Sequence, residues 1–369
     1  MYLMAITDVR VARWAKTLAE YCLDIQPGDI VSIASTPLAE PLITAFYRET
    51  LKHGGYPVPL ISLPSLNEIL LNDGSDEQLL WRSPIEAAVS ANANKRLRIS
   101  ASANPLALTN ISSERMALAN RPPQINPNAA KSPRALTWCG TLWPTEGAAQ
   151  LAGMSLAEFE EFVFEACFLN SDDPAERWKE LGRQQQKYVD WLKGKKAVEI
   201  HGTGVNLSLS IAGRTFINSD GKRNFPSGEF FTGPVEDSVN GSITFDFPSS
   251  RDGKIVRGAS LVFEKGKVIN ASAAEGEDFL LKMLNIDEGA RYLGEFAFGN
   301  NFGIDRAIIN TLYDEKIGGT IHMALGESYP ETGGLNHSAI HWDFIKEMRA
   351  DGEVYIDGEL FMKNGRFLF

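Results

Sequence analysis

The chain has 369 residues, of which 44% are hydrophobic and 22% charged, a composition typical of a folded protein with about two domains. Acidic residues number 47 against 36 basic ones, and the formal net charge of −11 argues against non-specific nucleic-acid binding and against docking on anionic lipid. The sequence shows no membrane-spanning apolar run, no secretory signal pattern and no Cys-x-x-Cys pair among its three cysteines, so we expect a reduced, cytoplasmic protein without membrane contact.

The first half alternates helical and extended patterns. Helical spacing predicts helices over about 11–22 and 38–52, and over 155–192, where two apolar stripes follow one another. Short apolar runs predict four strands, at 30–34, 58–63, 98–101 and 135–138. Strands separated by helices favour a mainly parallel sheet with helices on its faces.

The character of the sequence changes after the basic run Lys193–Lys196. Apolar and polar residues alternate over 205–211, the pattern of a half-buried strand, and further strands are expected at 242–247, 259–263 and 267–269. One helix is expected over about 276–285. The predicted fold is therefore an α/β domain over residues 1–194, followed by a β-rich α+β domain over residues 195–369.

Two glutamates of the second half stand in unusual surroundings. Glu229 lies between Pro-Ser-Gly and Thr-Gly-Pro, so a rigid loop fixes the direction of its carboxylate. Glu295 is a single charge among apolar and small residues in Leu293–Asn300. A buried carboxylate needs a partner, because leaving it unpaired costs several kcal/mol or drives it to the neutral form.

Three of the five histidines, His322, His337 and His341, are clustered in the sequence. His341 and Asp343 are two residues apart, so on an extended chain both side chains face the same side and reach one ion. His322 lies in an apolar stretch, whereas His337 has no such setting and is expected to be exposed. A single histidine in an apolar stretch is more often a core residue than a metal ligand, so the hypothesis depends on the whole set.

Together, Glu229, Glu295, His322, His341 and Asp343 suit two divalent cations. Oxygen and nitrogen donors without sulfur fit Zn, Co, Mn or Mg, and a bridging carboxylate holds two ions about 3.5–4 Å apart. By default, we expect the remaining charged residues of this region to be solvated; they are Asp314, Glu315, Lys316 and Glu327.

At these residues the sequence resembles the family of aminopeptidase T, aminopeptidase S and PepS, and the resemblance covers nearly the whole chain. The matching segments are Pro226–Glu229 with Phe231–Thr232, Gly294–Glu295 with Gly299–Asn300, Asp314–His322, Tyr329–Gly334 and His341–Asp343. The resemblance implies that the five residues above bind two metal ions. It also implies a role for Tyr329, seven residues after the first histidine, and a homodimer with an enclosed chamber.

The leading hypothesis is a metalloaminopeptidase that removes the N-terminal residue from peptides with a free N-terminus. Glu295 would accept the proton of the attacking water, and Tyr329 would donate a hydrogen bond to the developing oxyanion. Three alternatives stay open. His322, His341 and Asp343 alone would suit a mononuclear iron(II) ring-cleaving dioxygenase. Glu229 and Glu295 would suit a glycosidase, and a non-catalytic binding protein is the third alternative.

Overall fold

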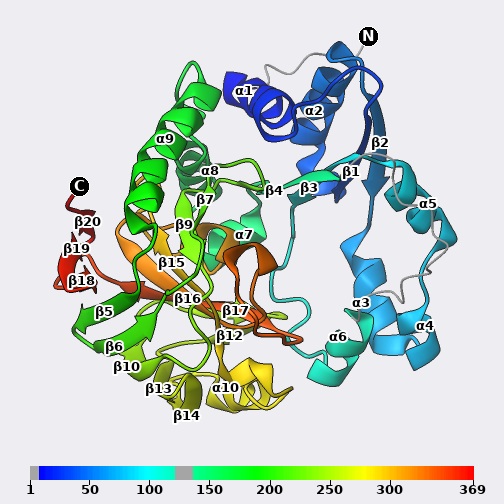
Figure 1. The fold of residues 1–369 in the computed structure, drawn as a ribbon. Coiled ribbons are helices and arrows are strands. Elements are labelled where there is room, and N and C mark those ends of the chain that lie inside the picture. The colour runs from blue at the N-terminus through cyan, green and yellow to red at the C-terminus, as the bar shows by residue number, and fades with distance from the viewer. Residues whose placement is uncertain (1–7, 121–135) are drawn as a thin grey trace. The chain divides into compact units, whose positions relative to one another are not determined.

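The computed structural model describes residues 8–120 and 136–369 (Figure 1). Contacts divide the chain into two compact units, Met1–Arg177 with Gly221–Phe225, and Trp178–Asp220 with Pro226–Phe369. The division falls inside helix α9 (Pro174–Leu192). The expected boundary at residues 194 and 195 stays a prediction.

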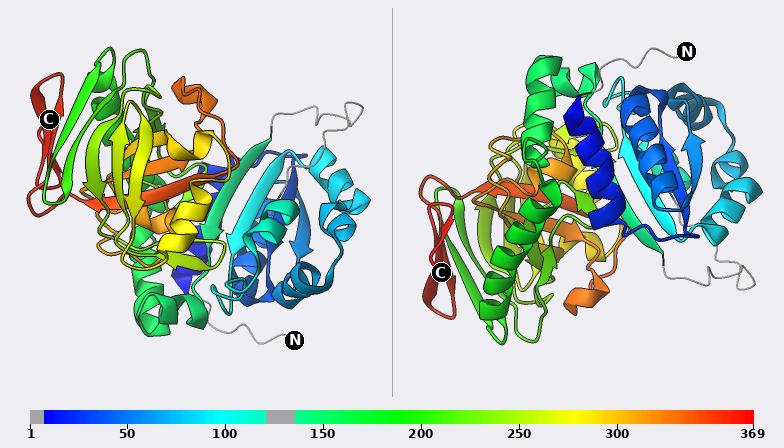
Figure 2. Two further views of the ribbon diagram at one scale, coloured as in Figure 1. Left: turned by 90° about the horizontal axis from the view of Figure 1, so that it is seen from below. Right: turned by 90° about the horizontal axis from the view of Figure 1, so that it is seen from above.

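The first unit is built on a parallel sheet in the order β2-β1-β3-β4-β8, whose strands lie side by side in Figure 2. Its strands are β1 (Ile30–Ser35), β2 (Tyr56–Ile61), β3 (Lys95–Ser100), β4 (Thr137–Leu142) and β8 (Asn224–Phe225). Its helices are α1 (Val9–Thr17), α2 (Glu40–Lys52), α3 (Pro64–Asp73), α4 (Asp76–Leu80), α5 (Pro84–Asn92), α6 (Ser113–Ala119), α7 (Glu146–Leu151) and α8 (Leu156–Ala166), with a π-helical turn Leu18–Cys22 after α1 and a 3-10 turn Pro37–Ala39 before α2. The α/β prediction is confirmed; Ala135 of the expected fourth strand lies outside the described residues.

The helical pattern over residues 155–192 forms two helices. Helix α8 ends near Phe168, which has a positive φ of 56°, and α9 begins at Pro174. Proline is tolerated in the first turn of a helix but not in its interior, where it removes a hydrogen bond and clashes with the preceding turn. The two apolar stripes in the sequence therefore belong to two separate helices.

The second unit contains two antiparallel sheets. The large sheet has the order β14-β13-β10-β6-β5-β18-β19-β20, and a second sheet, here called the ligand sheet, has the order β17-β16-β15-β9-β7. The large sheet consists of β5 (Ala197–Gly202), β6 (Val205–Ser210), β10 (Asn240–Thr244), β13 (Ser260–Glu264), β14 (Lys267–Ser272), β18 (Glu353–Ile356), β19 (Glu359–Lys363) and β20 (Arg366–Phe367). The ligand sheet consists of β7 (Ile217–Ser219), β9 (Glu229–Thr232), β15 (Leu293–Gly299), β16 (Thr320–Gly326) and β17 (His341–Glu347). The remaining elements are the hairpin β11 (Ser249–Arg251) and β12 (Lys254–Val256), helices α10 (Glu277–Met283) and α11 (Thr311–Asp314), and 3-10 turns Gly289–Arg291 and Pro330–Thr332. The predicted β-rich second half is confirmed.

Both sheets contribute to one hydrophobic core. Phe230 of β9 and Phe298 of β15 stack with ring centroids 5.0 Å apart, and Phe361 of β19 lies 5.3 Å from Phe298. Strands β15 and β16 are buried along their whole lengths. Because side chains alternate along a strand, one face of the ligand sheet packs into this core, and the other face carries a different set of residues.

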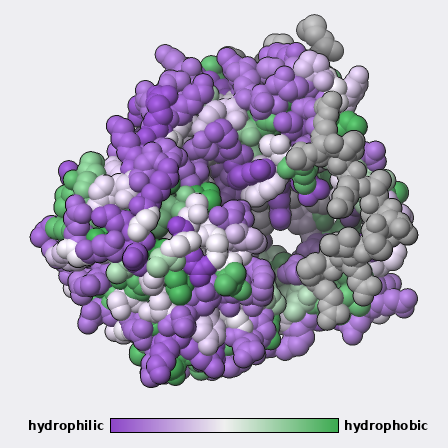
Figure 3. Space-filling view, viewed as in Figure 1, coloured by the Kyte–Doolittle hydropathy of each residue, from purple (hydrophilic) through white to green (hydrophobic). Residues whose placement is uncertain are grey.

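Surface properties agree with the composition. The face seen in Figure 3 is mostly hydrophilic, with hydrophobic residues in small scattered groups. Among the described residues, every helix is too short or too polar to cross a bilayer.

Candidate metal centre

All five residues predicted as ligands lie on the face of the ligand sheet that points away from the hydrophobic core. Glu229 begins β9, Glu295 is on β15 and His322 is on β16, while His341 and Asp343 are on β17. The strand register places Glu295, Ala324 and Asp343 in one row and Ala297 beside His322. Since the alanines between the ligands are small, this face has room between the polar side chains.

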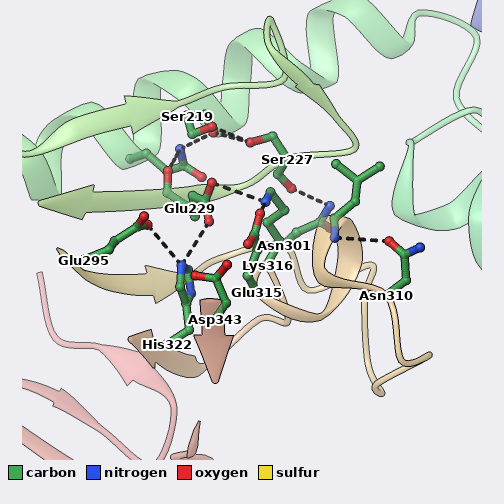
Figure 4. A network of polar contacts seen from close by, with 12 residues as sticks. Ser219, Ser227, Glu229, Glu295, Asn301, Asn310, Glu315, Lys316, His322 and Asp343 are labelled. Atoms are coloured by element: carbon green, nitrogen blue, oxygen red, sulfur yellow. Dashed lines mark hydrogen bonds and ion pairs between the residues drawn. The ribbon is translucent and has the colours of Figure 1, made fainter. Parts of the chain in front are cut away.

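Glu295 lies between the two histidines. Its Oε1 atom is 3.3 Å from Nε2 of His322, and its Oε2 atom is 3.2 Å from Nε2 of His341. Nε2 of His322 is also 3.4 Å from Oε2 of Glu229, and Nε2 of His341 is 3.7 Å from Oδ1 of Asp343. The two oxygens of one carboxylate therefore face two different imidazoles, and each imidazole has a second carboxylate beside it. Figure 4 shows His322 between Glu295 and Glu229.

The donor atoms form two groups of three. Glu229, Glu315 and His322 make one group, and Glu295, His341 and Asp343 make the other; within each group the ligand atoms lie within 4.8 Å of one another. Sequence reasoning missed Glu315 as a member of the site. The available signal was its place in the segment Asp314–His322, which had been matched to the family as a whole.

The expectation that Asp314, Glu315 and Lys316 are solvated is wrong. The Lys316 side chain is fully buried, and its Nζ atom lies 3.3 Å from Oε1 of Glu229 and forms an ion pair with Glu315, whose side chain is 12% exposed. Asp314 is buried and accepts hydrogen bonds from the backbone N–H groups of Ile308 and Asn310, at 2.8 and 2.9 Å. Burial raises the pKa of Asp314 to about 7, against the opposing effect of these backbone hydrogen bonds. The segment is a folded turn that carries a buried charge pair to the site.

The loop before Glu229 is fixed by its backbone. Gly228 has a φ of 107°, and a Cβ atom added there would lie 2.7 Å from Cβ of Asn301. The Asn301 side chain donates to the carbonyl of Ser227 at 3.0 Å, and Gln185 Nε2 donates to the carbonyl of Glu229 at 3.0 Å. These contacts set the direction of the Glu229 carboxylate (Figure 4), as the glycine-flanked sequence predicts.

The electrostatics of the site favour positive charge among the carboxylates. Although burial opposes its ionisation, hydrogen bonds from His322 and His341 hold the pKa of Glu295 at about 2. Burial opposes the charging of His341, but Asp343 and Glu295 raise its pKa to about 10; the pKa of His322 is also raised, against burial, by Glu295 and Glu229. Burial raises the pKa of Glu229. The positive charges of Lys316 and His322 act in the opposite direction, because they favour the ionised carboxylate.

The site meets the requirements of divalent cations. Among the described residues, buried polar atoms without a hydrogen-bond partner include Oε2 of Glu229, Oδ1 of Asp343 and Nδ1 of His322. Nδ1 of His341 lies 2.8 Å from the carbonyl oxygen of Glu327, an arrangement that leaves Nε2 as the metal-facing nitrogen. Carboxylate and imidazole donors with unsatisfied buried oxygens are the groups that a divalent cation binds.

Tyr329, His337 and Glu327 lie around this cluster. The Tyr329 ring centroid is 5.0 Å from that of His341 and 5.4 Å from that of Phe231. Partial burial and the nearby carboxylates of Glu295 and Asp343 raise the pKa of Tyr329, so the phenol keeps its proton. The His337 side chain is 81% exposed and its Nδ1 atom lies 3.2 Å from Oε1 of Glu327. Glu327 therefore supports the site through its main-chain carbonyl, while His337 faces solvent.

A buried set of carboxylates and histidines on one sheet face makes this a candidate site for divalent cations. The chain belongs to the thermophilic metalloprotease family M29, whose profile matches residues 7–367. This membership confirms the resemblance found in the sequence motifs.

Several known proteins are similar to the chain. Aminopeptidase AmpS from Bacillus subtilis is 32% identical over 57% of the chain and 58% of its own length, so that match spans little more than half of the relative. Aminopeptidase 2 from Geobacillus stearothermophilus is 27% identical, with 94% of each chain covered. Among solved structures, wild-type AmpT from Thermus thermophilus has a TM-score of 0.83 at 22% identity over 98% of this chain and 99% of the other. The 2,5-dihydroxypyridine dioxygenase of Pseudomonas putida KT2440 has a TM-score of 0.57 at 11% identity over 99% and 98% of the two chains, which shows a shared fold.

Proposed function

We propose that this protein is an aminopeptidase that uses two divalent cations to hydrolyse the N-terminal peptide bond of peptides. The observation that carries the proposal is the position of Glu295, whose two carboxylate oxygens face two different histidines. Each histidine belongs to a separate group of three ligand residues. A single-ion site needs only one such group, whereas a shared carboxylate between two groups is the arrangement of a two-metal site.

The residues would divide between the two ions as the groups indicate. Glu229, Glu315 and His322 would hold one ion, His341 and Asp343 the other, and Glu295 would bridge them. Zn, Co, Mn or Mg fits such oxygen and nitrogen donors. When bound, the ions would polarise the scissile carbonyl and lower the pKa of a water molecule toward neutrality.

The chain's own side chains supply the other steps. The carboxylates attract the cationic N-terminal amine of a peptide into the site. Glu295 would accept a proton from the attacking water and pass it to the leaving amine. Tyr329, protonated because of its raised pKa, would donate a hydrogen bond to the developing oxyanion.

The direct test compares free and blocked substrates. Protein stripped of metal and reloaded with Zn, Co, Mn or Mg is assayed against a panel of aminoacyl chromogenic amides and their N-acetylated forms. The proposal predicts amine release from the free forms only, and release that depends on the added cation. Fully loaded protein that cleaves none of the panel contradicts the proposal.

Protein as purified, and stripped protein reloaded with Fe²⁺, test the alternative of a mononuclear iron(II) dioxygenase, whose fold the chain shares. That alternative predicts about one iron per chain and oxygen uptake with a dihydroxylated aromatic substrate. It assigns no role to Glu229 and Glu295.

Two sequence predictions also belong to the aminopeptidase proposal: a homodimer, and a cytoplasmic location.

A further inference from the structure

Strand β17 carries two of the proposed ligand residues, His341 and Asp343, and is an edge strand of the ligand sheet. One edge of β17 pairs with β16, in a register that runs from Gly326 opposite His341 to Thr320 opposite Glu347. The other edge presents the main-chain carbonyls of His341, Asp343 and Ile345. Because buried carbonyl groups need donors, the partners of this edge decide how firmly the two ligand residues are held.

The segment Asp246–Arg251 supplies those donors, and each of the three carbonyls on this edge of β17 receives one. Nη1 of Arg251 donates to the carbonyl of His341 at 2.8 Å, and Oγ of Ser249 donates to the carbonyl of Asp343 at 2.6 Å. The backbone N–H of Asp246 lies 3.3 Å from the carbonyl of Ile345. The carbonyls of both ligand residues thus depend on side chains, where a sheet would ordinarily supply backbone N–H groups.

Ser249 is bonded on two sides. Its hydroxyl accepts a hydrogen bond from Nε1 of Trp342 at 2.8 Å while it donates to Asp343, and the residue is only 3% exposed. Trp342 packs into the hydrophobic core on the opposite face of β17. One hydroxyl therefore connects the core face of the strand to the main chain of a ligand residue.

The hairpin β11–β12 positions both donors. Ser249 pairs with Val256 and Arg251 with Lys254, and the turn between the strands uses Asp252 and Gly253, both with positive φ. Val256 is 1% exposed, which anchors the second strand in the core. Residues two apart on a strand face the same side, so Ser249 and Arg251 both reach β17, and Ser250 between them faces away.

We propose that the hairpin β11–β12 is a clamp that fixes His341 and Asp343 through their main-chain carbonyls, with Ser249 and Arg251 as positioning residues. This inference rests on the proposed metal centre, because it assigns the clamp to two of its ligands. Groups that orient metal ligands typically change metal affinity by about 10- to 100-fold when they are removed. Both clamp residues donate to the ligands' main-chain carbonyls. Ser249 is neutral and so tests geometry alone, whereas Arg251 also interacts electrostatically with Asp343, which makes Arg251→Lys its charge-matched control.

The clamp itself is tested in metal-stripped protein by hydrogen–deuterium exchange. Ser249→Ala and Arg251→Met should speed exchange of the β17 amides, while Ser249→Thr and Arg251→Lys, which keep a donor, should restore much of the protection. Ser250→Ala is the matched control and should leave exchange unchanged. Unchanged exchange in both loss variants overturns the clamp, and so does equal acceleration in the control.

The effect on the centre is tested with Co²⁺, whose absorption spectrum reports ligand geometry, by titration and chelator competition. Ser249→Ala should weaken binding of one of two ions by roughly 10- to 100-fold and change the Co²⁺ spectrum, and Ser249→Thr should recover both. A wild-type spectrum and affinity in Ser249→Ala and Arg251→Met overturn the positioning role. Faster exchange in the loss variants together with no Co²⁺ binding by the wild type supports the clamp and contradicts the proposed function instead.

Discussion

Replacing Glu295 with glutamine removes one charge and one oxygen from the centre of the site. In the wild type the two carboxylate oxygens lie 3.3 and 3.2 Å from Nε2 of His322 and of His341. The pKa of Glu295 falls from its ordinary value of 4.5 to about 2. The lowered pKa shows that this position favours the ionised carboxylate beside positively charged neighbours.

We expect Glu295→Gln to weaken binding of divalent cations by about 100-fold or more, because it removes a charged oxygen donor that faces both histidines of the site. Metal content after dialysis and competition with a chelator measure the loss, and amine release from an aminoacyl substrate should fall with it. Glu331→Gln, which removes an exposed carboxylate near Tyr329, is the control for charge alone. Two tightly held ions per chain in Glu295→Gln, at wild-type affinity, would refute the bridging role.

Three further substitutions test separate parts of the account. Lys316→Met removes the lysine cation from the buried carboxylate of Glu229 and leaves only the shared His322 beside it. The free energy of unfolding of metal-stripped protein should therefore fall by about 3–5 kcal/mol, with added Zn²⁺ restoring part of it, and an unchanged urea midpoint would contradict this. Gly228→Ala places a Cβ atom against Asn301 on a backbone with a φ of 107°, which should displace the neighbouring Glu229. Metal affinity should therefore fall, and wild-type affinity in a chelator titration would argue against the fixed loop. Tyr329→Phe should lower kcat by roughly 100-fold with little change in KM or in metal content, and an unaltered kcat removes Tyr329 from the mechanism.

The ligand face was predictable because its signal is local. Alternation along a strand places His341 and Asp343 on one side of β17, and the glycine and proline residues around Glu229 mark a fixed loop. Glu295 attracts attention as a lone charge in an apolar run. None of these patterns needs knowledge of distant contacts, and the structure brings all of these residues together on one sheet face.

Glu315 and Lys316 had no comparable local signal. An acidic and a basic residue beside each other in a turn are usually solvated, and only the packing of that turn against β9 buries Lys316 next to Glu229. The clamp could not be predicted from the sequence, because Ser249 and Arg251 are about 90 residues from β17 and contact it through main-chain carbonyls. Hydrogen bonds from side chain to backbone leave no spacing pattern in either segment.

Most of the fold followed from the alternation of patterns, but its connectivity did not. Strand β8 has only two residues, Asn224 and Phe225, and it joins the parallel sheet of the first unit after the chain has already entered the second. Two residues carry no periodicity, so no pattern predicts this return.

The central claim, a two-metal centre bridged by Glu295, is tested most directly by anomalous diffraction. Crystals of the wild-type protein loaded with Zn²⁺ or Co²⁺ are measured on both sides of the metal absorption edge, which identifies and counts the ions together. The account predicts two peaks per chain, one at Glu229, Glu315 and His322 and one at His341 and Asp343, with Glu295 between them. A single peak held by His322, His341 and Asp343 alone, with Glu295 away from it, would contradict the account.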